Sequence, residues 1–220
     1  LKAVVTSYTL SLAVCIPLSG WLADRYGSRR VFLSALTLFT LSSLVCGLAT
    51  SAPLLVAARV PQGIAAAMMM PVGRMAIVRT FAKGELLVAM NFVIIPALLG
   101  PLLGPTVGGL IVHFASWREM FFVNLPVGLA AWWFGHKHMP DYHGEVARPL
   151  DLRGFVLFGS AAALLSWLLE IFGEHQLATS HMLALAALAV GLFIAYGLHA
   201  RRQRHPLLRL ALFRTRTFRV

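Results

Sequence analysis

The chain has 220 residues, of which 59% are hydrophobic and only 12% are charged, whereas a soluble domain is about 45–50% apolar and about 25% charged. Nineteen Lys and Arg residues stand against eight Asp and Glu, giving a formal net charge of +11. The basic residues lie between apolar blocks of about 20 residues, the length that crosses a bilayer. These features exclude an ordinary soluble domain and favour a membrane protein over a nucleic-acid-binding protein.

Seven apolar blocks predict seven membrane-spanning helices and an all-α, polytopic fold. In chain order they are 3–23, 31–50, 54–73, 87–112, 119–136, 154–172 and 181–199. Sixteen of the 19 basic residues follow the first, third, fifth and seventh blocks, so this side is predicted to be cytoplasmic by the positive-inside rule. The first block then runs from outside to inside, and we expect the sequence to be a piece of a longer protein in which one span precedes it.

The loop after the first block, "GWLADRYGSRR", combines a charge pair with a glycine turn. Read alone, it is a basic cytoplasmic loop, although such a pair can also lock neighbouring helices in one state. The spacing resembles the cytoplasmic loop motif of the major facilitator superfamily, with Ser28 where a basic residue is common. The matching residues are Gly20, Asp24, Arg25, Gly27, Arg29 and Arg30.

The third block contains an arginine, Arg59, within its apolar run. An arginine inside a span costs at least about 2.5–3.5 kcal/mol, so it normally faces a cavity or a partner. The alternative is that Arg59 extends to the outer interface, which its shallow depth allows. The run Arg59, Gln62 and Gly63 resembles the fourth-helix motif of the same superfamily, and this resemblance implies that Arg59 couples protons to the transport cavity.

The fourth block carries "GPLLGPTVGG", in which Gly100, Gly104 and Gly108 recur every four residues on one helical face. Small residues at this spacing let two transmembrane helices approach closely, and prolines bend such helices without excluding them from membranes. The run resembles the fifth-helix motif of superfamily antiporters at Gly100, Gly104, Pro105, Gly108 and Gly109. The resemblance implies exchange of a substrate for protons.

The fifth block begins at an interfacial tryptophan–arginine pair, which is typical of a membrane boundary. Its residues Trp117, Arg118, Asn124 and Pro126 look like those of the fourteen-helix drug:proton antiporter branch, which inserts two helices between its six-helix halves.

The resemblance implies a division of the chain into four parts. Residues 1–138 would be helices 2–6 of the N-terminal bundle, and 139–153 a cytoplasmic connector. Residues 154–199 would be the two inserted helices, and 200–220 a basic segment leading to the second half. About seven of fourteen transmembrane helices would then be present.

The function implied is proton-driven efflux of amphipathic or cationic small molecules across the cytoplasmic (inner) membrane. The expected partners are a small-molecule substrate, protons and the lipid bilayer, with a periplasmic adaptor protein as a further candidate and no nucleic acid. The alternatives are a uniporter or symporter on the same scaffold and a membrane receptor that does not transport.

Other candidates for chemistry are weak. The sequence shows no nucleotide-binding loop, no nucleophile constellation and no nearby pair of catalytic carboxylates, so we expect no enzyme activity and no cofactor. His136, His138 and His143 have no further metal-ligand pattern around them, and no metal site is expected. Glu170 and Glu174 end the sixth block and are expected to lie at the membrane interface.

Overall fold

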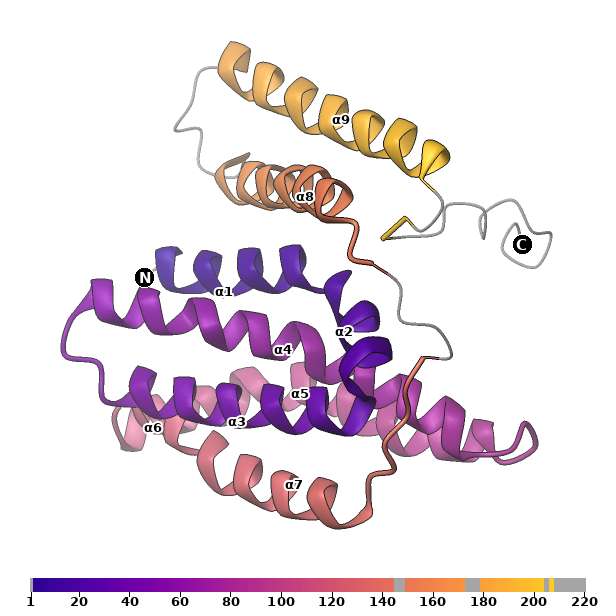
Figure 1. The fold of residues 1–220 in the computed structure, drawn as a ribbon. Coiled ribbons are helices and arrows are strands. Elements are labelled where there is room, and N and C mark those ends of the chain that lie inside the picture. The colour runs from indigo at the N-terminus through magenta and orange to yellow at the C-terminus, as the bar shows by residue number, and fades with distance from the viewer. Residues whose placement is uncertain (1, 145–148, 173–178, 204–205, 208–220) are drawn as a thin grey trace.

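The computed structural model describes residues 2–144, 149–172, 179–203 and 206–207, and the regular elements in these ranges are helices. This confirms the predicted all-α class for the described part of the chain. In order, the helices are α1 (Lys2–Cys15), α2 (Leu18–Tyr26), α3 (Ser28–Gly47), α4 (Ala52–Thr80), α5 (Leu86–Phe114), α6 (Glu119–Phe122), α7 (Asn124–His138), α8 (Leu152–Phe172) and α9 (Thr179–Arg202) (Figure 1).

Five of these helices, α3, α4, α5, α8 and α9, are long and apolar enough to cross a membrane. The pair α1 and α2 makes a sixth if it counts as one span. The chain is therefore a multi-pass membrane protein by the length and composition of its described helices.

Two predicted blocks are not single helices. The first block breaks between α1 and α2, which meet at 59°, and Pro17 lies at the break, where its ring cannot continue an unbroken helix. The fifth block divides into the four-residue α6 and the 15-residue α7. At 1.5 Å per residue α7 is about 22 Å long, which is short of the roughly 30 Å hydrocarbon core.

Helix α4 lies at the centre of the bundle. It packs against α1 on one side and α3 on the other, and α7 packs on the far side of α3 (Figure 1). Helix α8 lies along α1, and α9 lies along α8. Helix α5 runs behind this layer, makes its main contacts with α4 and α6, and has no buried residue.

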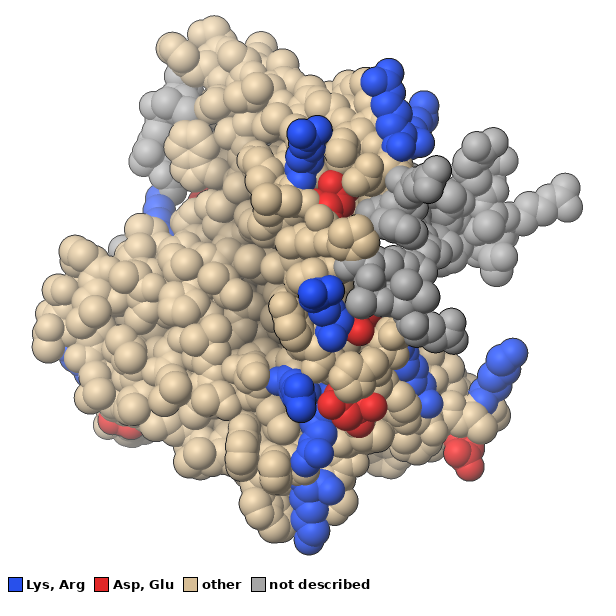
Figure 2. All heavy atoms as spheres, viewed as in Figure 1, with Lys and Arg blue, Asp and Glu red and all other residues tan. Residues whose placement is uncertain are grey.

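The two ends of the bundle differ in charge. Lys and Arg gather at the end where α2 turns into α3 and where α7 finishes, at the right of Figure 2, while little charge is visible on the opposite end. We call this the basic end. It is the end that the positive-inside rule assigns to the cytoplasm.

Close packing between the helices depends on residues with small side chains or none. A Cβ on Gly47 would lie 2.5 Å from Cε1 of Phe122, and a Cβ on Gly128 would clash with the hydroxyl of Thr40. These two glycines join α3 to α6 and α3 to α7. Small residues serve this purpose in membranes because lipid tails are as apolar as leucine, so helices associate through close contact.

Prolines inside α4 and α5 do not end these helices. Pro61 and Pro71 lie within α4, and α5 contains Pro96, Pro101 and Pro105. Membrane helices tolerate proline because neighbouring groups satisfy the freed backbone carbonyls. Helix α4 consequently continues to Thr80, beyond the end at residue 73 expected from the apolar block.

Candidate functional site

Arg59 points into the bundle and joins α4 to α1. Its Nε donates to the carbonyl oxygen of Val4 at 3.1 Å, and its Nη1 donates to Oε1 of Gln62 at 2.7 Å. The guanidinium also lies 4.1 Å from the ring centroid of Tyr8 and 5.9 Å from that of Phe121. The residue is half-buried among these partners, which favours the interior interpretation over extension to the interface.

Gln62 extends this contact to α3 and, through Ser43, to α7. The Gln62 side chain is 1% exposed, and its Nε2 donates to Oγ of Ser43 at 2.5 Å. Oγ of Ser43 also accepts from Nδ2 of Asn124 at 3.2 Å. Arg59, Gln62, Ser43 and Asn124, which we call the Arg59 network, therefore link α1, α3, α4 and α7. A buried polar network with satisfied members fixes one arrangement of its helices.

The charge of Arg59 is not balanced by an acidic side chain within the described ranges. No carboxylate oxygen there lies within 4.0 Å of its nitrogens. A backbone carbonyl, an amide and an aromatic ring solvate the guanidinium instead. Such a cation can respond to an anionic group that enters its surroundings.

Gly63 brings α1 and α4 into contact directly beside this network. A Cβ on Gly63 would clash with the carbonyl oxygen of Tyr8 and would lie 2.9 Å from Cβ of Ser11. Only glycine fits here without moving backbone. Since Arg59 and Gln62 lie beside it, all three residues of the predicted fourth-helix motif occupy the junction of α1 and α4.

The predicted loop motif lies at the basic end, between α2 and α3. Asp24 pairs with Nη2 of Arg79 on α4 at 3.1 Å, and Arg25 lies 5.8 Å from the centroid of the Trp21 ring. Gly27 has a φ of 92°, a left-handed conformation that favours glycine. The motif thus ties α2 to α4 through an ion pair and turns the chain into α3.

The other loop-motif residues have separate surroundings. Arg29 donates from its guanidinium to the carbonyl oxygen of His136 and from its backbone N–H to Oδ1 of Asp141 at 3.0 Å. Arg30 is exposed and lines a groove of about 420 Å³ between α2, α3 and α4. Gly20 is exposed, and nothing lies within 4 Å of where its Cβ would be.

The glycine face of α5 meets little in the described structure. A Cβ on Gly100, Gly104 or Gly109 would have nothing within 4 Å, and one on Gly108 would lie 3.8 Å from the sulfur of Met120. Gly100, Gly104 and Pro105 are exposed. The close helix contact predicted for this motif stays a prediction.

The branch-motif residues are divided between two places. The Arg118 guanidinium lies 4.5 Å from the Trp117 ring centroid and donates to the carbonyl oxygen of Ala49 at 3.2 Å. Asn124 belongs to the Arg59 network, although it lies 62 positions after Gln62. Pro126 is in the first turn of α7, where a missing N–H costs nothing.

The histidines and glutamates behave mainly as structural residues. Among the described residues, no three His, Cys, Asp or Glu side chains lie close enough to hold a metal ion. His136 stacks on Trp132 with ring centroids 5.1 Å apart. Glu170 accepts a hydrogen bond from the Thr6 hydroxyl and so joins α8 to α1. Glu174 lies outside the described residues.

Several partners in these contacts were not predicted from the sequence. Ser43 is one hydroxyl among many in an apolar helix, and Asp141 lies in a connector without periodicity. A third case is buried Asp151, whose Oδ1 lies 2.8 Å from Nε2 of His199 and accepts the N–H of Gly154 at 2.9 Å. An aspartate directly before a helix is a common N-terminal signal, and it could have identified Asp151.

Comparison with known proteins identifies the family of the chain. The family model described as Major Facilitator Superfamily matches residues 1–213. Among curated relatives, a protein of Escherichia fergusonii is 42% identical over 215 residues, covering 98% of this chain and 45% of the relative. Proteins of Pectobacterium atrosepticum and Serratia proteamaculans are 41% and 40% identical over 226 and 220 residues, covering all of this chain and 47% and 46% of the relatives.

All three relatives carry the provisional name multidrug resistance protein MdtD. The chain spans about half the length of these relatives. The family match covers every described helix. Because the family model matches residues 1–213 and the described helices are long and apolar, the chain belongs to the major facilitator superfamily of transporters.

Proposed function

We propose that the protein containing this chain exports amphipathic or cationic small molecules across the cytoplasmic membrane in exchange for protons. The observation that carries the proposal is the Arg59 network, which links four helices. In it the Arg59 cation lies within the bundle and has no carboxylate partner among the described residues. On the face shown in Figure 2, Lys and Arg side chains gather mostly at the basic end. A charge kept inside a membrane span is costly and usually marks a pathway for ions or substrate.

In this proposal Arg59 acts on a carboxylate that the rest of the protein supplies to the cavity. A nearby guanidinium favours the ionised form of such a group. Protonation would cancel the attraction between the two, and a cationic substrate would compete with the proton for the same carboxylate. Competition of this kind produces exchange rather than joint movement.

The names of the relatives support the class of substrate, since each of the three is called a multidrug resistance protein. The glycine-rich face of α5 supports the exchange mode, because we assign it to a tight interface with the second half of the transporter. The loop motif would hold the basic ends of α2 and α4 together in one of the transport states.

Transport by the complete protein in proteoliposomes tests the proposal. Arg59→Ala is expected to reduce dye transport driven by a pH gradient by at least about 10-fold, as for loss of a charge-assisted contact. Arg118→Ala is the matched control, because Arg118 also binds a backbone carbonyl and an aromatic ring but lies outside the network. Equal gradient-driven transport in Arg59→Ala and wild type would show that Arg59 has no coupling role.

The direction of the gradient separates the alternatives. An exchanger accumulates dye on the side with the higher proton concentration, whereas a symporter accumulates it on the opposite side. A uniporter equilibrates dye regardless of the gradient, and a receptor binds it without flux. Flux in liposomes that contain no other protein would show that a periplasmic adaptor is not required for the transport step.

A further inference from the structure

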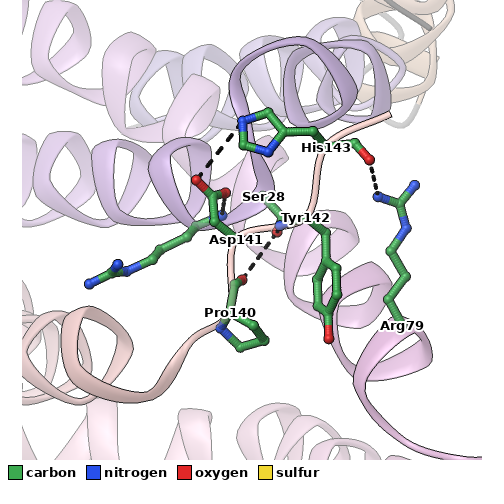
Figure 3. Close-up of polar contacts among 7 residues, drawn as sticks. Ser28, Arg79, Pro140, Asp141, Tyr142 and His143 are labelled. Carbon is green, nitrogen blue, oxygen red and sulfur yellow. Dashed lines mark hydrogen bonds and ion pairs between the residues drawn. The ribbon is translucent and has the colours of Figure 1, made fainter. Parts of the chain in front are cut away.

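The connector after α7 does not extend away from the bundle but runs along the loop between α2 and α3 (Figure 3). The N–H of Ser28 donates to the carbonyl oxygen of Tyr142 at 2.9 Å, and the N–H of Tyr142 donates to Oγ of Ser28 at 3.0 Å. The N–H of Gly144 donates to the carbonyl oxygen of Asp24 at 2.9 Å. These three bonds involve backbone groups, so they fix the path of the connector itself.

The side chain of Asp141 occupies a position that the loop leaves open for it. The residue before α3 is Gly27, which has no side chain to accept the free N–H groups of the first turn. Oδ1 of Asp141 accepts the N–H of Arg29 at 3.0 Å. A Cβ on Gly27 would clash with this carboxylate. Asp141 therefore supplies, from 112 positions away, the N-terminal cap that α3 lacks locally.

A second contact region lies around the Asp24–Arg79 ion pair. Nη1 of Arg79 donates to the carbonyl oxygen of His143 at 3.3 Å, while its Nη2 pairs with Asp24. A Cβ on Gly144 would lie 2.8 Å from Cβ of Asp24. The connector thus lies against both partners of the ion pair, and the pair and the connector hold each other in place.

We propose that residues 140–144 form a strap that positions the cytoplasmic loop motif, and that Asp141 is the residue that secures it by capping α3. The strap leads toward α8, so it joins the packed pair α8 and α9 to the loop that ties α2 to α4. Asp141 is a positioning residue in this proposal, since it acts through Arg29 and the turn at Gly27.

Hydrogen exchange of the complete protein in lipid nanodiscs tests the strap directly. Asp141→Ala removes the cap and is expected to speed amide exchange in residues 28–30 by about 5-fold, the typical effect of losing a cap. Asp141→Asn keeps an acceptor oxygen, and asparagine caps a helix about as well as aspartate does. Amide exchange of residues 28–30 in this variant is therefore expected to stay near the wild-type rate. His143→Ala is the control within the strap. It removes the imidazole, whose Nε2 lies 4.0 Å from Oδ2 of Asp141, but keeps Oδ1 of Asp141 as the cap and the backbone carbonyl that binds Arg79.

The proposal is overturned if the amides of residues 28–30 exchange at the wild-type rate in Asp141→Ala. It is also overturned if Asp141→Asn or His143→Ala speeds their exchange as much as Asp141→Ala does. Gly144→Ala provides a second variant should Asp141→Ala fail to fold. Its new Cβ pushes the strap away from Asp24 while leaving the cap residue unchanged, and faster exchange at residues 28–30 is again expected. Unchanged exchange in Gly144→Ala would likewise contradict the strap.

A transport measurement adds a second arm, which rests on the proposed function. Asp141→Ala is expected to lower the maximal rate of transport per folded protein several-fold with KM unchanged, because the strap acts on helix movement and conformational steps often limit turnover. Asp141→Asn should restore the rate. A raised KM at an unchanged rate would contradict a positioning role. If wild type does not couple transport to protons, the proposed function is wrong, but the hydrogen-exchange test of the strap is unaffected.

Discussion

The contact of Gly63 with α1 allows a stringent test of the helix junction beside Arg59. Gly63→Ala places a methyl group against the carbonyl oxygen of Tyr8 and 2.9 Å from Cβ of Ser11. Backbone cannot move aside as a flexible side chain does, so α1 and α4 must separate slightly. Gly73→Ala, on the same helix, is the matched control, since its methyl group would lie 3.6 Å from the Phe32 ring, an ordinary contact distance.

The difference between these two variants isolates the steric cost. Each substitution gains up to about 1 kcal/mol of helix propensity, and this term cancels in the comparison. Inserting a methyl group into a tightly packed site costs about 1–3 kcal/mol, and only Gly63→Ala has that cost. Gly63→Ala is therefore expected to have a free energy of unfolding about 1–3 kcal/mol below that of Gly73→Ala.

Unfolding by SDS titration in mixed micelles, followed by circular dichroism, measures both free energies on the complete protein. Gly73→Ala should match or slightly exceed the stability of wild type. If the two variants are equally stable, or if Gly63→Ala is the more stable of the two, α1 and α4 do not approach as closely as described.

Three further predictions follow from the polar contacts. Gln62→Leu is expected to lower the free energy of unfolding by about 2–3 kcal/mol, because it removes the acceptor of a charged hydrogen bond from Arg59. Gln62→Glu keeps an acceptor and should be as stable as wild type. An equal loss of stability in both variants, measured by SDS titration, would contradict this hydrogen bond. Arg79→Ala is expected to lower the free energy of unfolding by less than about 1 kcal/mol in the same assay, because the ion pair of Arg79 with Asp24 is partly exposed and surface pairs contribute little. A loss above about 2 kcal/mol would contradict this expectation. Asp151→Ala is expected to increase protease cleavage between α8 and the preceding connector, because the helix loses its N-terminal cap and the contact with His199; unchanged cleavage would count against both roles.

Much of the fold could be predicted because lipid imposes a simple rule on sequence. Every backbone group in a span must be satisfied internally, so apolar blocks of about 20 residues become helices, as five of the seven blocks did. The breaks at Pro17 and between α6 and α7 were not predicted. Proline is compatible with a continuous helix at Pro61 and with a break at Pro17, and the sequence near each does not distinguish the two outcomes.

The candidate site was predictable where one helix carries the whole pattern. Arg59, Gln62 and Gly63 lie within five positions of α4, and the structure brings all three to one junction. Ser43 could not be predicted, because its role depends on α3 meeting α4 and α7 at one level. Asp141 was hidden for a similar reason: a cap supplied from another segment leaves no local spacing to recognise.

Movement of protons driven by substrate alone is the sharpest test of proton exchange. Proteoliposomes containing the complete protein would be given a gradient of a cationic dye, with no initial pH gradient and the membrane potential clamped, while a pH indicator reports the lumen. We expect protons to move opposite to the dye, and we expect Arg59→Ala to lack this movement while Arg118→Ala retains it. Dye flux without proton movement, or protons moving with the dye, would contradict the claim of exchange.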